Sequence, residues 1–276
     1  MKKITIYFLF LLSTIPVTAE SYVFGGMGMQ LDLGQLGATI VTDGLDSSDG
    51  GKAIVAENKL KTAAAATGNT MMNVPVASSA MLGGVFNIGY EKDIGERFFA
   101  RTSVNYTDKI AGGHTIAKAG IYDWYNVRWN FQSWVIPVHF GIKIKTSDKS
   151  SVYIGGGMNY YQGGFGIKGR VDGATLASAG GIARKVTDAL GVSNTQIFDE
   201  DIQFRVKGTG LNWIIGASTP VSEKGSVFFE VETILSGQMG KGISKSEGGR
   251  KAIAYEAYYP VIIGGTIYRF GFKHEI

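Results

Sequence analysis

Ten ionisable side chains stand at alternate positions of segments whose other positions are mostly apolar. They are Asp32, Glu91, Arg97, Arg101, His139, Lys143, Glu230, Glu232, Arg269 and Lys273. Side chains of a β-strand point alternately to its two faces, so these residues would collect on one face of a sheet. Acids and bases on an enclosed face can form a salt-bridge network that fills it, or line a constriction that selects ions by charge. Both interpretations stay open at this stage, and the set has an excess of basic groups.

The histidines give little support for catalysis. The chain has three, His114, His139 and His274, and only His139 is expected on the ionic face. No acid or nucleophile is spaced around it in the way that a catalytic dyad requires. We therefore expect no enzyme activity. We also expect no metal site, because no ligands cluster, and no nucleotide or other cofactor, because the glycine-rich stretches lack the lysine of a phosphate-binding loop.

The elements that must position these residues are eight segments with a period of two. They lie at residues 22–33, 79–91, 97–109, about 123–145, 151–162, 202–218, 226–236 and 257–276. The fourth segment reverses its phase, since DWYNVRWNF at 123–131 alternates in the opposite sense to residues 134–144. We expect a β-bulge near Phe131–Gln132, because one extra residue exchanges the two faces of a strand.

The connections between the segments alternate in length. Short turns such as KDIGE, TSDKS and TPVSEKG alternate with long loops at 34–78, 110–122, 163–201 and 237–256. This alternation is typical of a transmembrane antiparallel up-and-down β-barrel with short periplasmic turns and long extracellular loops. Eight strands are favoured, and ten strands are the alternative because residues 52–62 could belong to a further hairpin. A soluble barrel with its apolar face inward is the other alternative, since periodicity alone does not separate the two.

Composition and the first residues support export to a membrane. Charged residues make up 18% of the chain, Gly numbers 40 and Cys is absent, so disulfides and thiol catalysis are excluded. Residues 1–19 have two lysines, a short apolar run and small residues at the end, as in a secretory signal peptide. We expect residues 20–276 to form a single outer-membrane β-barrel domain. Loss of Lys2 and Lys3 lowers the formal charge from +4 to +2, so nucleic-acid binding is not expected.

The long loops carry two further features. Leu176, Ile182, Val186 and Leu190 have helical spacing, which predicts a short helix within 174–191 that folds over the barrel mouth or meets a partner. The last loop contains a basic group that could bind an acidic partner, although a solvated charged loop is the simpler explanation. Its candidate residues are Lys241, Lys245, Arg250 and Lys251.

The chain ends on an aromatic-faced strand, GTIYRFGFKHEI, which must pair with the first strand to close the sheet. This ending resembles the signal read by the barrel-assembly machinery, although it finishes in Ile276 rather than Phe. Together with GGVFNIGYEKDIG (83–95), YIGGGMNYYQGG (153–164) and VFFEVETILSG (227–237), it resembles the major porin-type outer-membrane protein family of Leptospira spirochaetes.

The resemblance implies a surface-exposed integral protein with pore activity. We therefore predict porin-like passive transport of ions or small polar solutes across the outer membrane. The alternative is an adhesin with a largely plugged barrel, because the resemblance also implies binding of host extracellular-matrix proteins. Outer-membrane lipid is an expected partner. An oligomer stays open, since eight strands enclose an interior only just wide enough for side chains.

Overall fold

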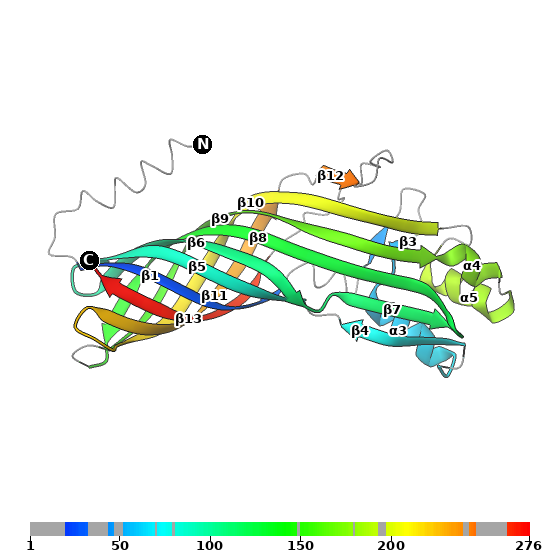
Figure 1. Cartoon of the computed structure of the whole chain (residues 1–276), viewed down its shortest axis with the longest axis horizontal. Helices are drawn as coiled ribbons and strands as arrows, with labels where there is room; N and C mark the ends of the chain where they lie inside the picture. The colour runs from blue at the N-terminus through cyan, green and yellow to red at the C-terminus, as the bar shows by residue number, and fades with distance from the viewer. Residues whose placement is uncertain are drawn as a thin grey trace.

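A closed ring of eight antiparallel strands dominates the computed structural model (Figure 1). The structure describes residues 20–32, 44–46, 52–69, 71–78, 81–147, 150–178, 180–192, 197–239, 243–246 and 264–276. The ring strands are β1 (Ser21–Asp32), β5 (Met81–Ile94), β6 (Phe98–Ala111), β8 (Tyr122–Lys145), β9 (Ser151–Asp172), β10 (Ile197–Pro220), β11 (Gly225–Met239) and β13 (Gly265–Glu275). Each pairs with the next, and β13 closes the ring on β1. The prediction of an eight-stranded barrel is confirmed, and the ten-stranded alternative is wrong.

The ring has an apolar outside and a polar inside. Phe86, Ile88 and Phe270 are well exposed on the outer face, whereas Arg101 and Glu230 are fully buried. A soluble barrel would show the reverse arrangement, because water would meet its outer face. The lipid-facing orientation that the alternation predicts is therefore confirmed.

Short turns and the C-terminus lie together at one end of the barrel (Figure 1). The turn at residues 95–97 joins β5 to β6, and the left-handed φ of 68° at Gly95 suits a residue without a Cβ. The backbone N–H of Ile276 donates to the carbonyl of Ser21 at 2.9 Å, so the chain end is held beside the start of β1. In the described chain, the terminal strand is paired along its length rather than frayed.

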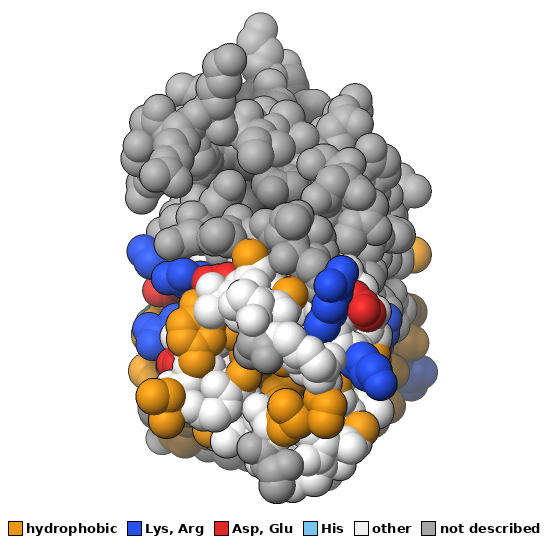
Figure 2. Space-filling model, turned by 90° about the vertical axis from the view of Figure 1, so that its right-hand side faces the viewer, with side chains coloured by type: hydrophobic (Ala, Val, Ile, Leu, Met, Phe, Trp, Pro, Cys, Tyr) orange, Lys and Arg blue, Asp and Glu red, His pale blue; other side chains and the backbone are white. Residues whose placement is uncertain are grey.

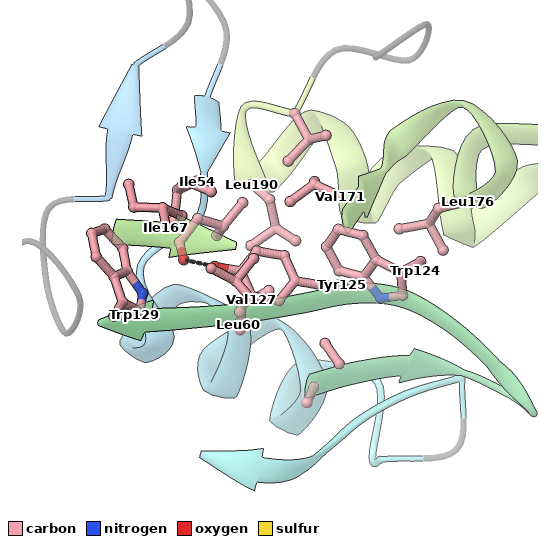
Figure 3. Packing of buried hydrophobic residues seen from close by; sticks show 14 of the residues in the cluster. Ile54, Leu60, Trp124, Tyr125, Val127, Trp129, Ile167, Val171, Leu176 and Leu190 are labelled. Atoms are coloured by element: carbon pink, nitrogen blue, oxygen red, sulfur yellow. Dashed lines mark hydrogen bonds between the residues drawn. The ribbon is translucent and has the colours of Figure 1, made fainter. Parts of the chain in front are cut away.

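Strands β8, β9 and β10 continue well beyond the ring and form the frame of a second layer. There β8 pairs with β7 (His114–Ala119), β7 pairs with β4 (Met72–Ser78), and β10 pairs with β12 (Ile243–Ser246). Three helices accompany this sheet: α3 (Glu57–Ala66), α4 (Gly173–Ser178) and α5 (Gly181–Leu190). A small ribbon of β2 (Leu45–Asp46) and β3 (Lys52–Ile54) lies nearby (Figure 3). We refer to the described residues within 52–78, 114–131 and 163–192 as the cap.

The cap has its own hydrophobic core. Trp124 and Tyr125 of β8 point toward Leu176 and Leu190 of the two short helices (Figure 3). Leu60 of α3 is completely buried in the same cluster. The Tyr125 hydroxyl donates to the carbonyl of Val55 at 2.8 Å, and burial raises the pKa of this phenol well above its ordinary value. The cap is therefore packed like a small soluble domain.

The helix predicted within 174–191 is present as two helices. Glycine at position 180 has a φ of 69° and separates α4 from α5, and Gly191 ends α5 with a φ of 70°. Leu176 and Leu190 are buried in the cap core, whereas Ile182 is exposed. None of the described helices has the length and apolar character needed to span a bilayer.

The predicted bulge near Phe131–Gln132 is wrong. The pairing of β8 with β9 runs from Tyr125 to Lys145 without a register shift. Phe131, Ser133 and His139 all face inward, so the phase of the strand does not change. Instead, the apolar side chains change from the outer to the inner face of the strand. In the barrel the outer face meets lipid and the inner face meets a polar lumen. Above the membrane the outer face meets water and the inner face packs in the apolar core of the cap. The irregularity in β8 lies at Trp124, which has no partner in β7 between Asp123 and Tyr125.

Candidate functional site

The barrel interior brings together eight of the ten ionisable residues that the alternation selects. They are Glu91, Arg101, His139, Lys143, Glu230, Glu232, Arg269 and Lys273, all of them buried or nearly so. Arg97 is the exception, because β5 ends at Ile94 and Arg97 sits exposed in the following turn. Its predicted place in the lumen is wrong. The side chain of Asp32 lies outside the described residues.

Two guanidinium groups hold Glu230 at the centre of the interior. Arg101 crosses the lumen from β6 and donates from Nη1 and Nη2 to the two carboxylate oxygens of Glu230 at 2.7 and 3.0 Å. Arg269, directly opposite Glu230 in the neighbouring strand, donates from Nε to the same carboxylate. The hydroxyl of Tyr153 adds a fourth hydrogen bond at 2.8 Å. A buried carboxylate with this many donors is compensated for its loss of water.

Glu232 links the centre to His139. Arg269 Nη2 donates to Glu232 Oε2 at 2.6 Å, and Asn212 Nδ2 donates to Oε1 at 2.8 Å. His139 Nε2 lies 3.3 Å from the same Oε1. The expectation that no acid stands beside His139 is therefore wrong. Spacing along the chain could not reveal this acid, because Glu232 reaches His139 across the lumen from a strand that is not its neighbour.

A second group of charges lies on the periplasmic side. Lys273 Nζ donates to both oxygens of Glu91, at 2.9 and 2.8 Å, and Lys143 lies 3.2 Å from Glu91. Lys143 also donates to Asp93 at 2.5 Å. The two groups meet where Arg101 Nη1 comes within 3.7 Å of Glu91. We refer to all the residues in these contacts as the ionic network.

The ionic network has balanced formal charge when His139 is neutral. Its acids are Glu91, Asp93, Glu230 and Glu232, and its bases are Arg101, Lys143, Arg269 and Lys273. The predicted basic excess is wrong for this set, because Arg97 is absent from it and Asp93 is present. Alternation missed Asp93 because it lies next to the turn. It also missed Asn212 and Tyr153, which the same period-two pattern could have placed inside.

Aromatic rings line the network and rest on glycines of neighbouring strands. The Arg101 guanidinium lies 4.1 Å from the ring centre of Phe24, and Lys273 Nζ lies 4.6 Å from that of Tyr153. A Cβ at Gly216 would fall 2.5 Å from the Tyr153 ring, and one at Gly141 would fall 2.6 Å from Phe99. These glycines therefore make room for rings that pack the lumen laterally.

A polar layer and then an apolar layer follow above the network. The side-chain amide atoms of Asn87 and Asn159 are buried, and they have no hydrogen-bond partner among the described residues. Higher still, Phe131 and Tyr161 face inward and belong to the cap core. No group of three or more His, Asp or Glu side chains in the described part of the chain is arranged to hold a metal ion.

The end of the molecule beyond the cap combines exposed apolar and basic side chains. Figure 2 looks onto this end and shows hydrophobic patches with Lys and Arg side chains around them. Ile121, between β7 and β8, is 100% exposed, and Ile182 of α5 is 53% exposed. Of the predicted loop candidates, Lys245 lies in β12 with an undescribed side chain, and Lys241, Arg250 and Lys251 lie outside the described residues.

Comparisons with known proteins found one matching family and several distant solved structures. A family model described as Leptospira porin protein OmpL1 matches residues 20–276. No curated protein matches the chain. Among solved structures, a major outer membrane protein from Thermus thermophilus is 11% identical, with 94% of this chain and 100% of that chain covered and a TM-score of 0.45.

Two further solved structures are similar at the same low level. The outer membrane protein OprG from Pseudomonas aeruginosa is 9% identical over 94% of this chain and 96% of its own, with a TM-score of 0.42. The outer membrane protease OmpT from Escherichia coli is 9% identical over 96% of this chain and 100% of its own, with a TM-score of 0.37.

Proposed function

The chain belongs to the Leptospira porin protein OmpL1 family and is an integral outer-membrane β-barrel, and we propose that it passes ions and small polar solutes along the inner face of this barrel. The observation that carries the proposal is the ionic network inside a closed, lipid-facing ring. In this proposal the network is the constriction of the pore and, at rest, also its plug.

Size limits the proposed conduction. Eight strands leave room for side chains but not for a wide water channel. A solute can pass only while the ionic network rearranges. Glu230 is held by Arg101, Arg269 and Tyr153 together, so one partner can leave while the others still compensate the carboxylate. We therefore expect small and intermittent currents.

The polar layer above the network supports the same route. Amide oxygens and N–H groups of Asn87 and Asn159 face the interior without a partner among the described residues. Such groups can replace part of the hydration shell of an ion, as the linings of ion pores do. The apolar cap core beyond them forms the last barrier, which must open or be bypassed for release.

Single-channel recording in planar bilayers tests this function. The balanced network should show little preference between anions and cations. Glu230→Gln with Glu232→Gln leaves Arg101 and Arg269 in excess, so the reversal potential in a salt gradient should shift toward anions. Glu96→Gln with Glu223→Gln removes the same charge from exposed turns and is the matched control. Currents that are identical in both double variants would contradict a constriction at the network.

His139 serves the network in this proposal and is not a catalyst. The described side chains that it contacts are Asn212 and Glu232, and neither is a nucleophile of the hydroxyl or thiol kind. Purified protein should therefore hydrolyse neither peptide nor lipid ester substrates. Turnover that His139→Gln abolishes would overturn this assignment.

Surface adhesion is a second candidate function, favoured by one observation. Ile182 lies on α5 with the basic residues Arg184 and Lys185. The exposed Ile121 lies in the turn between β7 and β8, at the same end of the molecule, which faces away from the membrane (Figure 1). Such a patch suits binding to host extracellular-matrix proteins. Ile121→Ser with Ile182→Ser should weaken binding to immobilised matrix protein without changing the currents. We further propose that the terminal strand β13 engages the barrel-assembly machinery, and that any oligomer forms through the lipid-facing surface.

A further inference from the structure

The outer face of the extended sheet carries a polar strip that conduction does not use. Gln132, Asn130 and Arg128 follow one another at alternate outward positions of β8. Pairing places His114 of β7 and Lys168 of β9 on either side of Arg128. We refer to these five residues as the outer strip (β7, β8 and β9 in Figure 1).

The outer strip begins where the lipid-facing surface ends. Trp134 and Tyr106 stack with ring centres 4.6 Å apart, as expected of an interfacial aromatic girdle. Below Trp134 the outward side chains include Phe140 and Ile142, both exposed and apolar. Directly above it, Gln132 Nε2 donates to the Tyr106 hydroxyl at 2.6 Å. The strip therefore continues the membrane-facing surface upward rather than lying on a separate part of the molecule.

Height sets what can reach the basic end of the strip. Arg128 stands six residues above Trp134, or about 20 Å along the strand. With the usual strand tilt this is about 15 Å above the girdle. The headgroup zone of an ordinary bilayer leaflet is only about 5–8 Å thick. A simple phospholipid headgroup thus ends short of Arg128, whereas a lipid with an oligosaccharide headgroup reaches it.

Charge sets the sign of the ligand. Arg128 is exposed, and its Nε lies 3.4 Å from Nε2 of His114, which also lies 3.1 Å from Oδ1 of Asn126. Among the described residues Arg128 forms no ion pair, and neither of its partners in register is an acid, since His114 lies opposite it in β7 and Lys168 in β9. Lys168 lies between Arg128 and Asp201 in register, so the anion site depends on Arg128 and His114 rather than on Lys168. Guanidinium and imidazole groups that meet in this way suit a phosphate or a carboxylate.

The lower part of the strip suits the sugar rings that would carry that anion. Gly164 and Gly166 of β9 lie opposite Gln132 and Asn130, so bare backbone adjoins the two amides. Amide side chains both donate and accept hydrogen bonds, as sugar hydroxyls require. Bare backbone next to them allows a ring to approach closely.

We propose that the outer strip binds an outer-leaflet glycolipid whose saccharide headgroup carries phosphate or carboxylate groups. Gln132 and Asn130 contact the sugars next to the membrane, and Arg128 with His114 binds the anion farther out. The acyl chains of the same lipid lie against the apolar belt below Trp134. Binding of this kind anchors the extended sheet, and with it the cap, to the membrane surface.

Native mass spectrometry of the full-length mature protein in nanodiscs tests the proposal. Four probes separate the sources: lipopolysaccharide with core sugars, lipid A alone, phosphatidylglycerol, and free core oligosaccharide. We expect lipopolysaccharide to be retained most strongly. Arg128→Gln with His114→Gln should lower its retention about tenfold, which corresponds to loss of one charge-assisted hydrogen bond. Arg184→Gln, an exposed arginine on α5, is the matched control and should change nothing.

Each remaining outcome has a definite meaning. Rescue of binding by Arg128→Lys supports a charge effect and excludes misfolding, which the intrinsic fluorescence of the cap tryptophans also monitors. Equal retention of phosphatidylglycerol and lipopolysaccharide would overturn the saccharide assignment. Free oligosaccharide that binds as tightly as the whole lipid would overturn the membrane source. Unchanged retention in the double variant would overturn the site itself.

Discussion

The barrel and the cap share strands β8 and β9, but the apolar and polar faces of these strands are exchanged between the two regions. In the barrel the inward face of β8 carries His139 and the outward face Phe140. In the cap the inward face of the same strand carries Trp129 and Phe131, and the outward face carries Arg128 and Asn130. The backbone keeps one phase from Tyr125 to Lys145. The side-chain types thus follow the surroundings of the strand, with lipid below and water above.

The inversion predicts that the two regions depend on different forces. The barrel interior is held by ion pairs and hydrogen bonds, because its apolar side chains face lipid. The cap is held by apolar burial, as in a soluble domain. Substitutions that are severe in one region should therefore be mild in the other.

The largest effect is expected from Arg269→Ala. The change leaves Glu232 with His139 and the amides of Asn212 and Asn105 but no arginine, and it removes one of two guanidinium groups from Glu230. Loss of one partner from a buried ion pair costs about 3–5 kcal/mol. Urea unfolding in lipid vesicles measures this for the whole barrel, with exposed Arg184→Ala as control. A loss below about 1 kcal/mol would mean that the network does not hold the barrel together.

Leu60→Ala should destabilise the cap by about 2–5 kcal/mol and leave the barrel folded. Leu60 is fully buried in the cap core and has no place in the ionic network. Faster proteolysis within the cap, with the compact gel mobility of the barrel retained, is the expected result. Simultaneous loss of both regions would show that they unfold as one unit.

Phe229→Lys should cost about 2–4 kcal/mol, because a charge on the lipid face of a barrel is expensive near mid-membrane. Phe229 is 55% exposed on the outer face of β11. The same apolar-to-lysine change at Ile121, which is fully exposed on the cap, should stay within about 0.5 kcal/mol. Equal losses of unfolding free energy at Phe229 and Ile121 would contradict the conclusion that the barrel surface meets lipid and the cap surface meets water.

The smallest effect concerns pH and Asp172, which lies in the cap beyond the membrane. Burial opposes ionisation of this carboxyl, but hydrogen bonds from the Thr175 N–H, Arg170 and Tyr122 outweigh it and lower its pKa from 3.8 to about 2. A lowered pKa gives stability that is fully present above pH 3.8 and is lost as the pH falls through about 2. Tryptophan fluorescence of the cap should therefore change between about pH 4 and pH 2. Asp172→Asn should remove this dependence and keep a side chain that can accept from the Thr175 N–H at the start of α4.

Alternation is enough to predict the ring and most of the network. Glu230, Arg269 and Lys273 lie within strands of strict period two, where the face of each residue follows from its neighbours. The alternation misplaces Arg97 and misses Asp93, because it stops at the turn between β5 and β6. The contact from Arg101 to Glu230 crosses the lumen, and such a pairing depends on how the ring closes rather than on any local pattern.

The cap is the least predictable part. The upper half of β9, GGFGIKGRVD, is rich in glycine, and this composition favours a loop over a strand. The opposite alternation at 123–131 indicates a bulge only if the outer face of the strand meets lipid along its whole length. In the structure the outer face of this part lies above the membrane, so the alternation reverses without a bulge. Residues 174–191 do show helical spacing, and that prediction succeeds because the buried side of each short helix is apolar.

The place of Arg269 and Lys273 in the chain has a consequence for biogenesis. Both cations are on β13, which follows the other seven ring strands in the chain. Until β13 docks between β11 and β1, Glu91 and Glu232 each lack a principal counterion. A chain truncated before residue 265 would keep Glu232 in the barrel interior without its arginine, and we expect it to insert less stably than the full chain. Correct docking of β13 therefore neutralises the interior in the same step that closes the ring.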